Sequence, residues 1–123
     1  MPKKSGTVLI VEDDAAVRSS LKCALEVEGL SVRLYDGPAA LLADGNLPRC
    51  GCLVVDYRMP GMDGLQLMET LRARDVVLPA ILITGRANKQ LHRFAEMAGI
   101  GSVLEKPLSD GALVESIRSA LGT

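Results

Sequence analysis

Residues 53–64 have the sequence LVVDYRMPGMDG, an apolar run that leads through Asp56 into a turn rich in proline and glycine. An uncharged apolar run of this length, followed by Pro60 and Gly61, predicts a buried strand. A carboxylate at the exit of a parallel strand lies at the carboxyl edge of the sheet, where open α/β folds bind their ligands. Asp56 is therefore the first candidate for chemistry in this chain.

The sequence on either side of this stretch alternates between short apolar runs and segments with helical periodicity. Strands are expected at residues 7–11, 30–35, 52–55, 80–83 and 102–104. Helices are expected after Asp14 as far as residue 28, and at residues 38–43, 65–73, 87–97 and 110–121. On the helix at residues 87–97, the apolar residues expected to share a face with Ala98 are Leu91, Phe94 and Ala95.

This alternation predicts an α/β fold, because parallel strands need helical crossovers and these are right-handed. We expect a flavodoxin-like (βα)5 three-layer α-β-α sandwich, with a parallel five-stranded sheet in the order 2-1-3-4-5. Two helices should cover one face and three the other. The first strand is followed by neither a Rossmann glycine fingerprint nor a Walker loop, so a nucleotide-binding version of this layout is not expected.

The 123 residues contain no internal linker or repeat, so residues 1–123 are expected to form one domain, with no output domain visible after it. A net charge of -1 gives no electrostatic footprint for direct nucleic-acid binding by this domain. The uncharged apolar runs are far shorter than the ~20 residues of a membrane-spanning helix. We therefore expect no membrane contact, a cytoplasmic location and reduced cysteines.

In such a sheet the carboxyl ends of four strands would bring together Glu12, Asp13, Asp56, Thr84 and Lys106. Three neighbouring carboxylates repel one another unless a cation offsets their charge. Hard oxygen ligands with room for water and a phosphoryl oxygen suit Mg²⁺. The pattern thus predicts a magnesium site at this edge of the sheet.

Between such a metal and Lys106, Asp56 is equipped to act as a nucleophile that accepts a phosphoryl group. Metal and ammonium would neutralise the transferred oxygens, which is the main catalytic task in phosphoryl transfer. The hydroxyl of Thr84 can donate to a phosphoryl oxygen that exists only after modification. Thr84 is therefore a candidate reader of the phosphorylated state.

Four motifs in order resemble the receiver domain of two-component response regulators across essentially the whole chain. They are Glu12-Asp13, Asp56-x-x-Met59-Pro60-x-Met62-Asp63-Gly64, Thr84-Gly85 and Lys106-Pro107. Any one motif is a weak signal, whereas all four at the ends of strands one, three, four and five are highly specific. The segment 11–18 and the Asp56-x-Arg58-Met59-Pro60 arrangement look most like FixJ-type receivers, which precede a helix-turn-helix output domain.

The resemblance implies a switch and not a metabolic enzyme. It implies that Asp56 is the phospho-acceptor, that Glu12 and Asp13 hold Mg²⁺, and that the main-chain carbonyl of Arg58 is a further ligand. The phosphoryl donor would be a sensor histidine kinase or a phosphotransfer protein. Control of transcription and phosphorylation-dependent homodimerisation are further properties common in the family.

For the other motifs, the resemblance implies that Thr84 is the switch hydroxyl, that Lys106 pairs with the phosphate and that the Lys106-Pro107 peptide is cis. Val103 stands where the family usually carries an aromatic residue three positions before the lysine, and Leu108 stands where another often follows. This departure favours an alternative: a stand-alone or phosphorylation-independent receiver that acts as a protein-interaction adaptor. A phosphatase with an aspartyl-phosphate intermediate would require a second aspartate at position 58, which is Arg58.

Several other residues could take part in binding or catalysis by their chemistry, but their positions favour structural roles. Asp14 and Asp63 precede helices and are expected to cap them, not to ligate metal. Met59 and Met62 are expected to pack the turn after Asp56. His92 is expected to be a solvated residue of the fourth helix and not a phosphorelay histidine, because nothing else in the chain supports phosphotransfer from it.

Overall fold

The computed structural model describes residues 6–108 and 110–122 of the chain. The strands are β1 (Thr7–Val11), β2 (Ser31–Tyr35), β3 (Gly51–Asp56), β4 (Ala80–Thr84) and β5 (Ser102–Glu105). The helices are α1 (Ala15–Val27), α2 (Pro38–Ala43), α3 (Gly64–Ala73), α4 (Lys89–Met97) and α5 (Asp110–Leu121). The strands and helices alternate along the chain as the sequence predicts.

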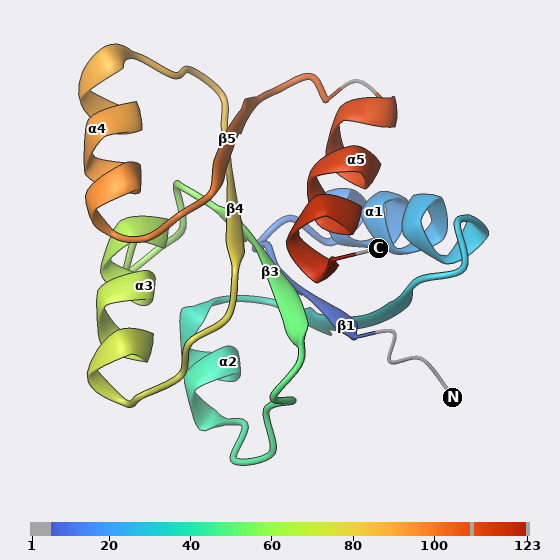
Figure 1. Ribbon diagram of the computed structural model, residues 1–123, viewed down its shortest axis with the longest axis horizontal. Coiled ribbons are helices and arrows are strands. Elements are labelled where there is room, and N and C mark those ends of the chain that lie inside the picture. Colours follow the sequence, from blue (N-terminus) through green and yellow to red (C-terminus); the bar gives the residue numbers. More distant parts are fainter. Residues whose placement is uncertain (1–5, 109, 123) are drawn as a thin grey trace.

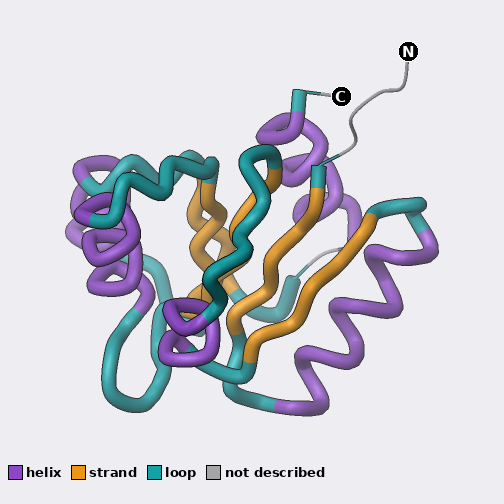
Figure 2. The backbone as a smooth tube through the Cα atoms, turned by 90° about the horizontal axis from the view of Figure 1, so that it is seen from below, coloured by secondary structure: helices purple, strands orange, loops and turns teal. Residues whose placement is uncertain are grey.

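The five strands form one parallel sheet in the order β2-β1-β3-β4-β5, which confirms the expected topology. Figure 1 shows α1 and α5 on one side of this sheet and α2, α3 and α4 on the other, and Figure 2 shows the strands side by side between the helices. The two-plus-three arrangement of helices is therefore also confirmed. No helix in the described part of the chain is long and apolar enough to cross a membrane.

Alternate residues of the central strands face opposite helical layers, because successive side chains of a strand point to opposite faces. In β1, Leu9 and Val11 pack in the core under α2, α3 and α4, whereas Val8 and Ile10 pack in the core under α1 and α5. All four side chains are fully buried. The continuous apolar runs of the sequence thus correspond to strands covered on both faces.

Two aspartates begin helices as predicted. The carboxylate of Asp14 accepts hydrogen bonds from the N–H groups of Ala16 and Val17 at 2.9 and 3.2 Å. Asp63 and Gln66 form a reciprocal capping box at the start of α3, with both hydrogen bonds at 2.9 Å. Helix α1 ends before Gly29, whose φ of 84° lies in the left-handed region that glycine adopts without strain.

Helix α4 differs from the prediction in its start and in its buried face. It begins at Lys89, two residues later than expected, because the side chain of Asn88 accepts the N–H of Leu91 at 2.7 Å and so caps the helix. Leu91 and Ala95 face the core, whereas Phe94 is 45% exposed. Phe94 therefore lies at the edge of the face that the apolar spacing assigned to it.

Candidate functional site

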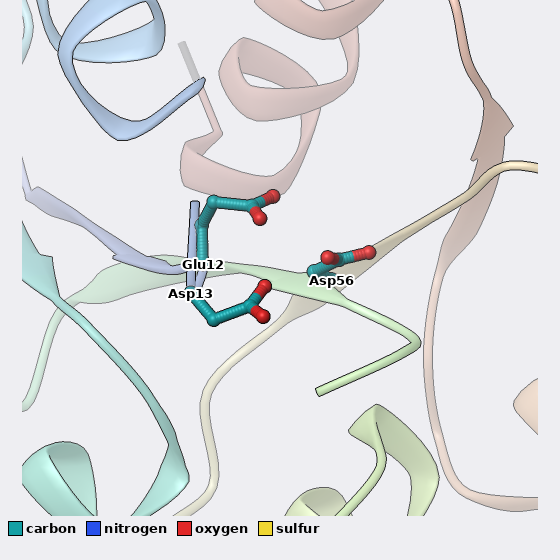
Figure 3. Close-up of side chains that lie close together, drawn as sticks. All are labelled: Glu12, Asp13 and Asp56. Atoms are coloured by element: carbon teal, nitrogen blue, oxygen red, sulfur yellow. The ribbon is translucent and has the colours of Figure 1, made fainter. Parts of the chain in front are cut away.

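The register of the sheet brings the ends of β1 and β3 together. Val11 pairs with Val55, so the residues that follow each of them, Glu12 and Asp56, lie side by side at the end of the two strands. Carboxylate oxygens of Glu12, Asp13 and Asp56 all lie within 4.8 Å of one another. Figure 3 shows the Glu12 and Asp13 side chains extending from the end of β1 toward Asp56.

Burial singles out this edge of the sheet from the rest of the molecule. Among the residues that the structure describes, the buried polar or charged ones are Glu12, Asp56 and Thr84, which are 2%, 7% and 2% exposed. Burying a polar group costs free energy unless it is paired. The grouping of these buried polar residues at the ends of three adjacent strands marks a functional site and not a general feature of the core.

The loop after β3 is fixed to the sheet and to α3. Tyr57 donates its N–H to the carbonyl of Ile83 at 2.8 Å and accepts the N–H of Gly64 at 2.9 Å. Met59 is buried in the core on the α3 side, and Met62 packs against the same core, as predicted. These anchors hold Asp56 and the backbone of residues 57–63 in one place.

Gly64 allows the N-terminus of α3 to approach Asp56. A Cβ atom at position 64 would lie 2.7 Å from Cδ1 of Leu82 and 3.1 Å from the backbone carbonyl oxygen of Asp56. Only glycine avoids this contact. The glycine of the sequence motif therefore has a steric cause: it seats the first turn of α3 directly behind the candidate nucleophile.

Lys106 supplies the positive charge at the site. Its Nζ lies 3.6 Å from Oδ1 of Asp56 and 3.8 Å from Oε1 of Glu12. Its backbone N–H donates to the carbonyl of Thr84 at 2.8 Å, which ties the end of β5 to the end of β4. The peptide between Lys106 and Pro107 is cis, in agreement with the resemblance.

Glu12 has a strongly perturbed acidity. Its pKa is raised from 4.5 to about 7, chiefly by burial and to a lesser extent by the negative charge of Asp56. The N–H of Asp14, which donates to Oε2 of Glu12 at 3.1 Å, and the ammonium of Lys106 act in the opposite direction. A nearby positive charge would therefore favour proton loss from Glu12.

This donor set fits a hard divalent cation. Three carboxylates converge: Glu12 and Asp56 are buried, and Asp13 is exposed to water. Burial makes Glu12 reluctant to ionise. Mg²⁺ prefers oxygen ligands, keeps several waters and takes few protein carboxylates. Glu12, Asp13 and Asp56 are thus the residues that could hold it.

Thr84 lies in the same pocket as Asp56, Arg58 and Lys106, together with Gly85 and Arg86. Its Oγ1 donates to the carbonyl of Arg86 at 3.2 Å and accepts the N–H of Arg86 at 3.3 Å. The hydroxyl is therefore engaged with its own loop. It can donate to another oxygen in the pocket only after it releases the carbonyl of Arg86.

The structure thus brings every candidate residue named from the sequence to one edge of the sheet, and two residues that sequence reasoning missed also contact this edge. Arg18 donates to the carbonyls of Glu12 and Asp13. The carboxylate of Glu105 accepts the N–H of Ala87 at 2.7 Å. Both contacts join a side chain to a backbone group, so the spacing of residue types in the sequence does not predict them. For Arg18 there is one indication, because its position one turn into a helix places its side chain within reach of the preceding loop.

Comparison with known proteins agrees with this geometry. The family model of the response regulator receiver domain matches residues 8–118. The transcriptional regulatory protein FixJ of Azorhizobium caulinodans is 40% identical over 115 residues, which cover 94% of this chain and 54% of that protein. The C4-dicarboxylate transport transcriptional regulatory protein DctR of Rhodobacter capsulatus is 40% identical over 119 residues, covering 95% of this chain and 60% of that protein.

Solved structures show the same relationship. The crystal structure of FixJ-N has a TM-score of 0.88 at 34% identity and covers 98% of this chain and 96% of that chain. The response regulator StyR has a TM-score of 0.88 at 34% identity and covers 97% of this chain and 60% of that chain. The chemotaxis protein CheY4 of Vibrio cholerae, at 21% identity and a TM-score of 0.87, shares the fold. The chain spans about half the length of the curated FixJ relative.

Proposed function

The chain belongs to the response regulator receiver family of two-component transcriptional regulators, and we propose that it is a phosphorylation switch in which Asp56 accepts a phosphoryl group. The donor is the phosphohistidine of a sensor kinase or of a phosphotransfer protein. The cation is Mg²⁺, held by the carboxylates of Glu12, Asp13 and Asp56 and by the main-chain carbonyl of Arg58. The protein is a switch that assists only its own phosphorylation and dephosphorylation.

One observation carries this proposal: the buried polar residues in the described part of the chain gather around one lysine. The distances of 3.6 and 3.8 Å place the ammonium of Lys106 beside both Asp56 and Glu12. If Lys106 only formed a structural ion pair, one carboxylate beside it would be enough. The extra carboxylates leave negative charge uncompensated, which is the condition that a cation relieves.

In the proposed reaction an oxygen of Asp56 attacks the phosphorus atom of the donor. The oxygen–phosphorus bond forms as the nitrogen–phosphorus bond breaks, and the bonding electron pair returns to the histidine nitrogen, which takes a proton. Lys106 neutralises one developing charge on the phosphoryl oxygens. Bound Mg²⁺ supplies further positive charge to those oxygens.

Thr84 reports the modification. Once Asp56 carries a phosphoryl group, its oxygens offer acceptors in the pocket that Thr84 shares. The hydroxyl then exchanges the carbonyl of Arg86 for a phosphoryl oxygen, and the loop between β4 and α4 follows. This movement shifts the population toward a second conformation that a partner can recognise.

The wider role follows from the relatives. They are named as transcriptional regulators and are about twice as long as the segment they share with this chain. We propose that residues 1–123 form one receiver domain that controls an output domain of this kind. Nucleic acid would be contacted by that output domain and not by this one, with phosphorylation promoting homodimerisation.

The test is phosphorylation of the wild-type protein and of Asp56→Asn by acetyl phosphate or a cognate kinase with Mg²⁺. The wild type should gain an acid-stable, base-labile label, and Asp56→Asn should lose it. Glu69→Gln is the matched control, because Glu69 is exposed on α3 and removing its charge leaves the site intact. Equal labelling of Asp56→Asn and Glu69→Gln would refute the assignment of Asp56.

One observation favours a second function, that of a phosphorylation-independent adaptor. Val103 packs partly buried against the core at the position where receivers usually carry an aromatic ring, so no ring can rotate there. Beryllofluoride, a phosphoryl mimic, separates the two functions through amide hydrogen exchange. Altered exchange in α4 and β5 supports the switch, whereas a change confined to the site supports the adaptor.

A further inference from the structure

The segment between β1 and α1 carries two of the three acids, and Arg18 holds it from the side of α1. Arg18 lies in the second turn of α1 and is partly buried. Its Nη1 donates to the carbonyl of Glu12 at 2.9 Å and to the carbonyl of Asp13 at 3.2 Å. One nitrogen therefore bridges two consecutive peptide groups of the acidic segment.

The two carbonyls flank the Cα atom of Asp13. When both neighbouring peptide planes are fixed, the φ and ψ angles of Asp13 are fixed as well, and with them the direction of its Cα–Cβ bond. The side chain of Asp13 is exposed, so packing does not set its direction. The backbone held by Arg18 sets it instead.

The rest of the segment is anchored at its start. Glu12 donates its N–H to the carbonyl of Tyr35 at 3.1 Å, which continues the hydrogen-bond pattern between β1 and β2. Its carboxylate accepts the N–H of Asp14 at 3.1 Å. The cap formed by Asp14 holds the other end of the segment to α1. Between these two anchors Arg18 binds the carbonyls of Glu12 and Asp13.

Charge and geometry give Arg18 opposite effects on a cation. A guanidinium beside a divalent cation repels it, so removing this charge alone would strengthen Mg²⁺ binding. Losing the two hydrogen bonds would release Asp13 and weaken Mg²⁺ binding. The direction of the change therefore identifies which effect dominates.

We propose that Arg18 is a positioning residue for the metal site, and that it holds the Glu12–Asp13 backbone so that both carboxylates meet the cation. This inference rests on the proposed Mg²⁺ site. The role of Arg18 lies in its hydrogen bonds to the backbone beside the ligands, and these bonds can be lost while all the acidic ligands remain. Residues that orient metal ligands commonly change metal affinity by about 10- to 100-fold when removed.

The test is Mg²⁺ binding by titration calorimetry to the wild type, Arg18→Met and Lys22→Met. Methionine keeps much of the aliphatic length of arginine and removes its donors. Lys22 is a matched control, because it lies one turn further along α1 and its ammonium pairs with Glu26 at 3.7 Å, away from the acidic segment. Arg18→Met should bind Mg²⁺ roughly tenfold more weakly, and Lys22→Met within about twofold of the wild type.

A second readout, amide hydrogen exchange of the metal-free proteins, separates positioning from general loss of stability. Faster exchange at Asp14, whose N–H donates to Oε2 of Glu12, in Arg18→Met with unchanged exchange in β1 supports the proposal. Mg²⁺ affinity in Arg18→Met that equals or exceeds that of Lys22→Met overturns it and leaves the proposed function standing. Absence of Mg²⁺ binding by the wild type would overturn the metal site itself, and this inference with it.

Discussion

Replacing Glu12 with glutamine should stabilise the metal-free fold while it removes the proposed Mg²⁺ site. Glu12 is buried, and its pKa is raised from 4.5 to about 7, chiefly by burial. The folded state therefore binds a proton that the unfolded state has lost between these two pH values. Glutamine resembles the protonated acid in shape and hydrogen bonding, and its carbonyl oxygen can still accept the N–H of Asp14.

The magnitude follows from linkage between proton binding and folding. A shift from 4.5 to about 7 corresponds to about 3 kcal/mol of unfolding free energy. Because the folded pKa is the higher one, this stability is fully present below pH 4.5 and is lost as the pH rises through about 7. Glu12→Gln should thus exceed the metal-free wild type by roughly 2 kcal/mol at pH 6 and by roughly 3 kcal/mol at pH 8.

The assay is urea denaturation in EDTA at several pH values from 4 to 8. Glu69→Gln is again the matched control, since its exposed side chain should leave the pH dependence of the wild type unchanged. Calorimetry on the same proteins should show wild-type Mg²⁺ affinity rising toward pH 8 and none for Glu12→Gln. A wild type and Glu12→Gln whose stabilities run parallel from pH 4 to 8 would refute the argument.

Two further predictions concern packing and the loop before α4. A Cβ atom at Gly51 would lie 2.5 Å from a backbone carbonyl oxygen of β1, so Gly51→Ala should lower the unfolding free energy by about 1–3 kcal/mol in urea denaturation. A Cβ atom at Gly45 would meet open space, so the control Gly45→Ala should change the unfolding free energy by less than about 0.5 kcal/mol. Equal effects of the two substitutions would contradict the steric argument. Glu105→Ala should speed amide hydrogen exchange at Ala87, whose N–H it accepts at 2.7 Å, and unchanged exchange there would show that this hydrogen bond does not hold the loop.

The sequence predicts the fold well because each central strand is a continuous apolar run and each run ends at a polar residue. Parallel register then brings those ends to one edge without any knowledge of side-chain contacts. The helix caps at Asp14 and Asp63 are equally predictable from the sequence, since a capping residue bonds to the backbone two or three positions later. Local rules therefore sufficed for most element boundaries and for the gathering of Glu12, Asp13, Asp56, Thr84 and Lys106.

The buried face of a helix and the contacts of its ends with distant segments are harder to predict from the sequence. Phe94 has the spacing of a buried residue, yet Leu91 and Ala95 fill the core beneath α4 and leave it 45% exposed. The sequence places the start of α4 at Ala87, a good helix former, whereas Asn88 caps the helix and Ala87 lies before it, bonded to Glu105. Contacts between a side chain and a distant backbone group leave no periodic pattern in the sequence.

The contact between Glu105 and Ala87 bears on how phosphorylation would be transmitted in this chain. Val103 offers no aromatic ring to move at this position, so in the proposed switch the loop before α4 would carry the change. Two anchors hold this loop: Thr84 bonds both backbone groups of Arg86, and Glu105 bonds Ala87. A Thr84 hydroxyl that turns toward a phosphoryl group releases the first anchor, and the second then limits how far the loop can move. In the proposed switch, the chemistry thus depends on the ends of β1, β3 and β5, whereas the extent of the response depends on the carboxylate of Glu105, which binds the backbone of the loop.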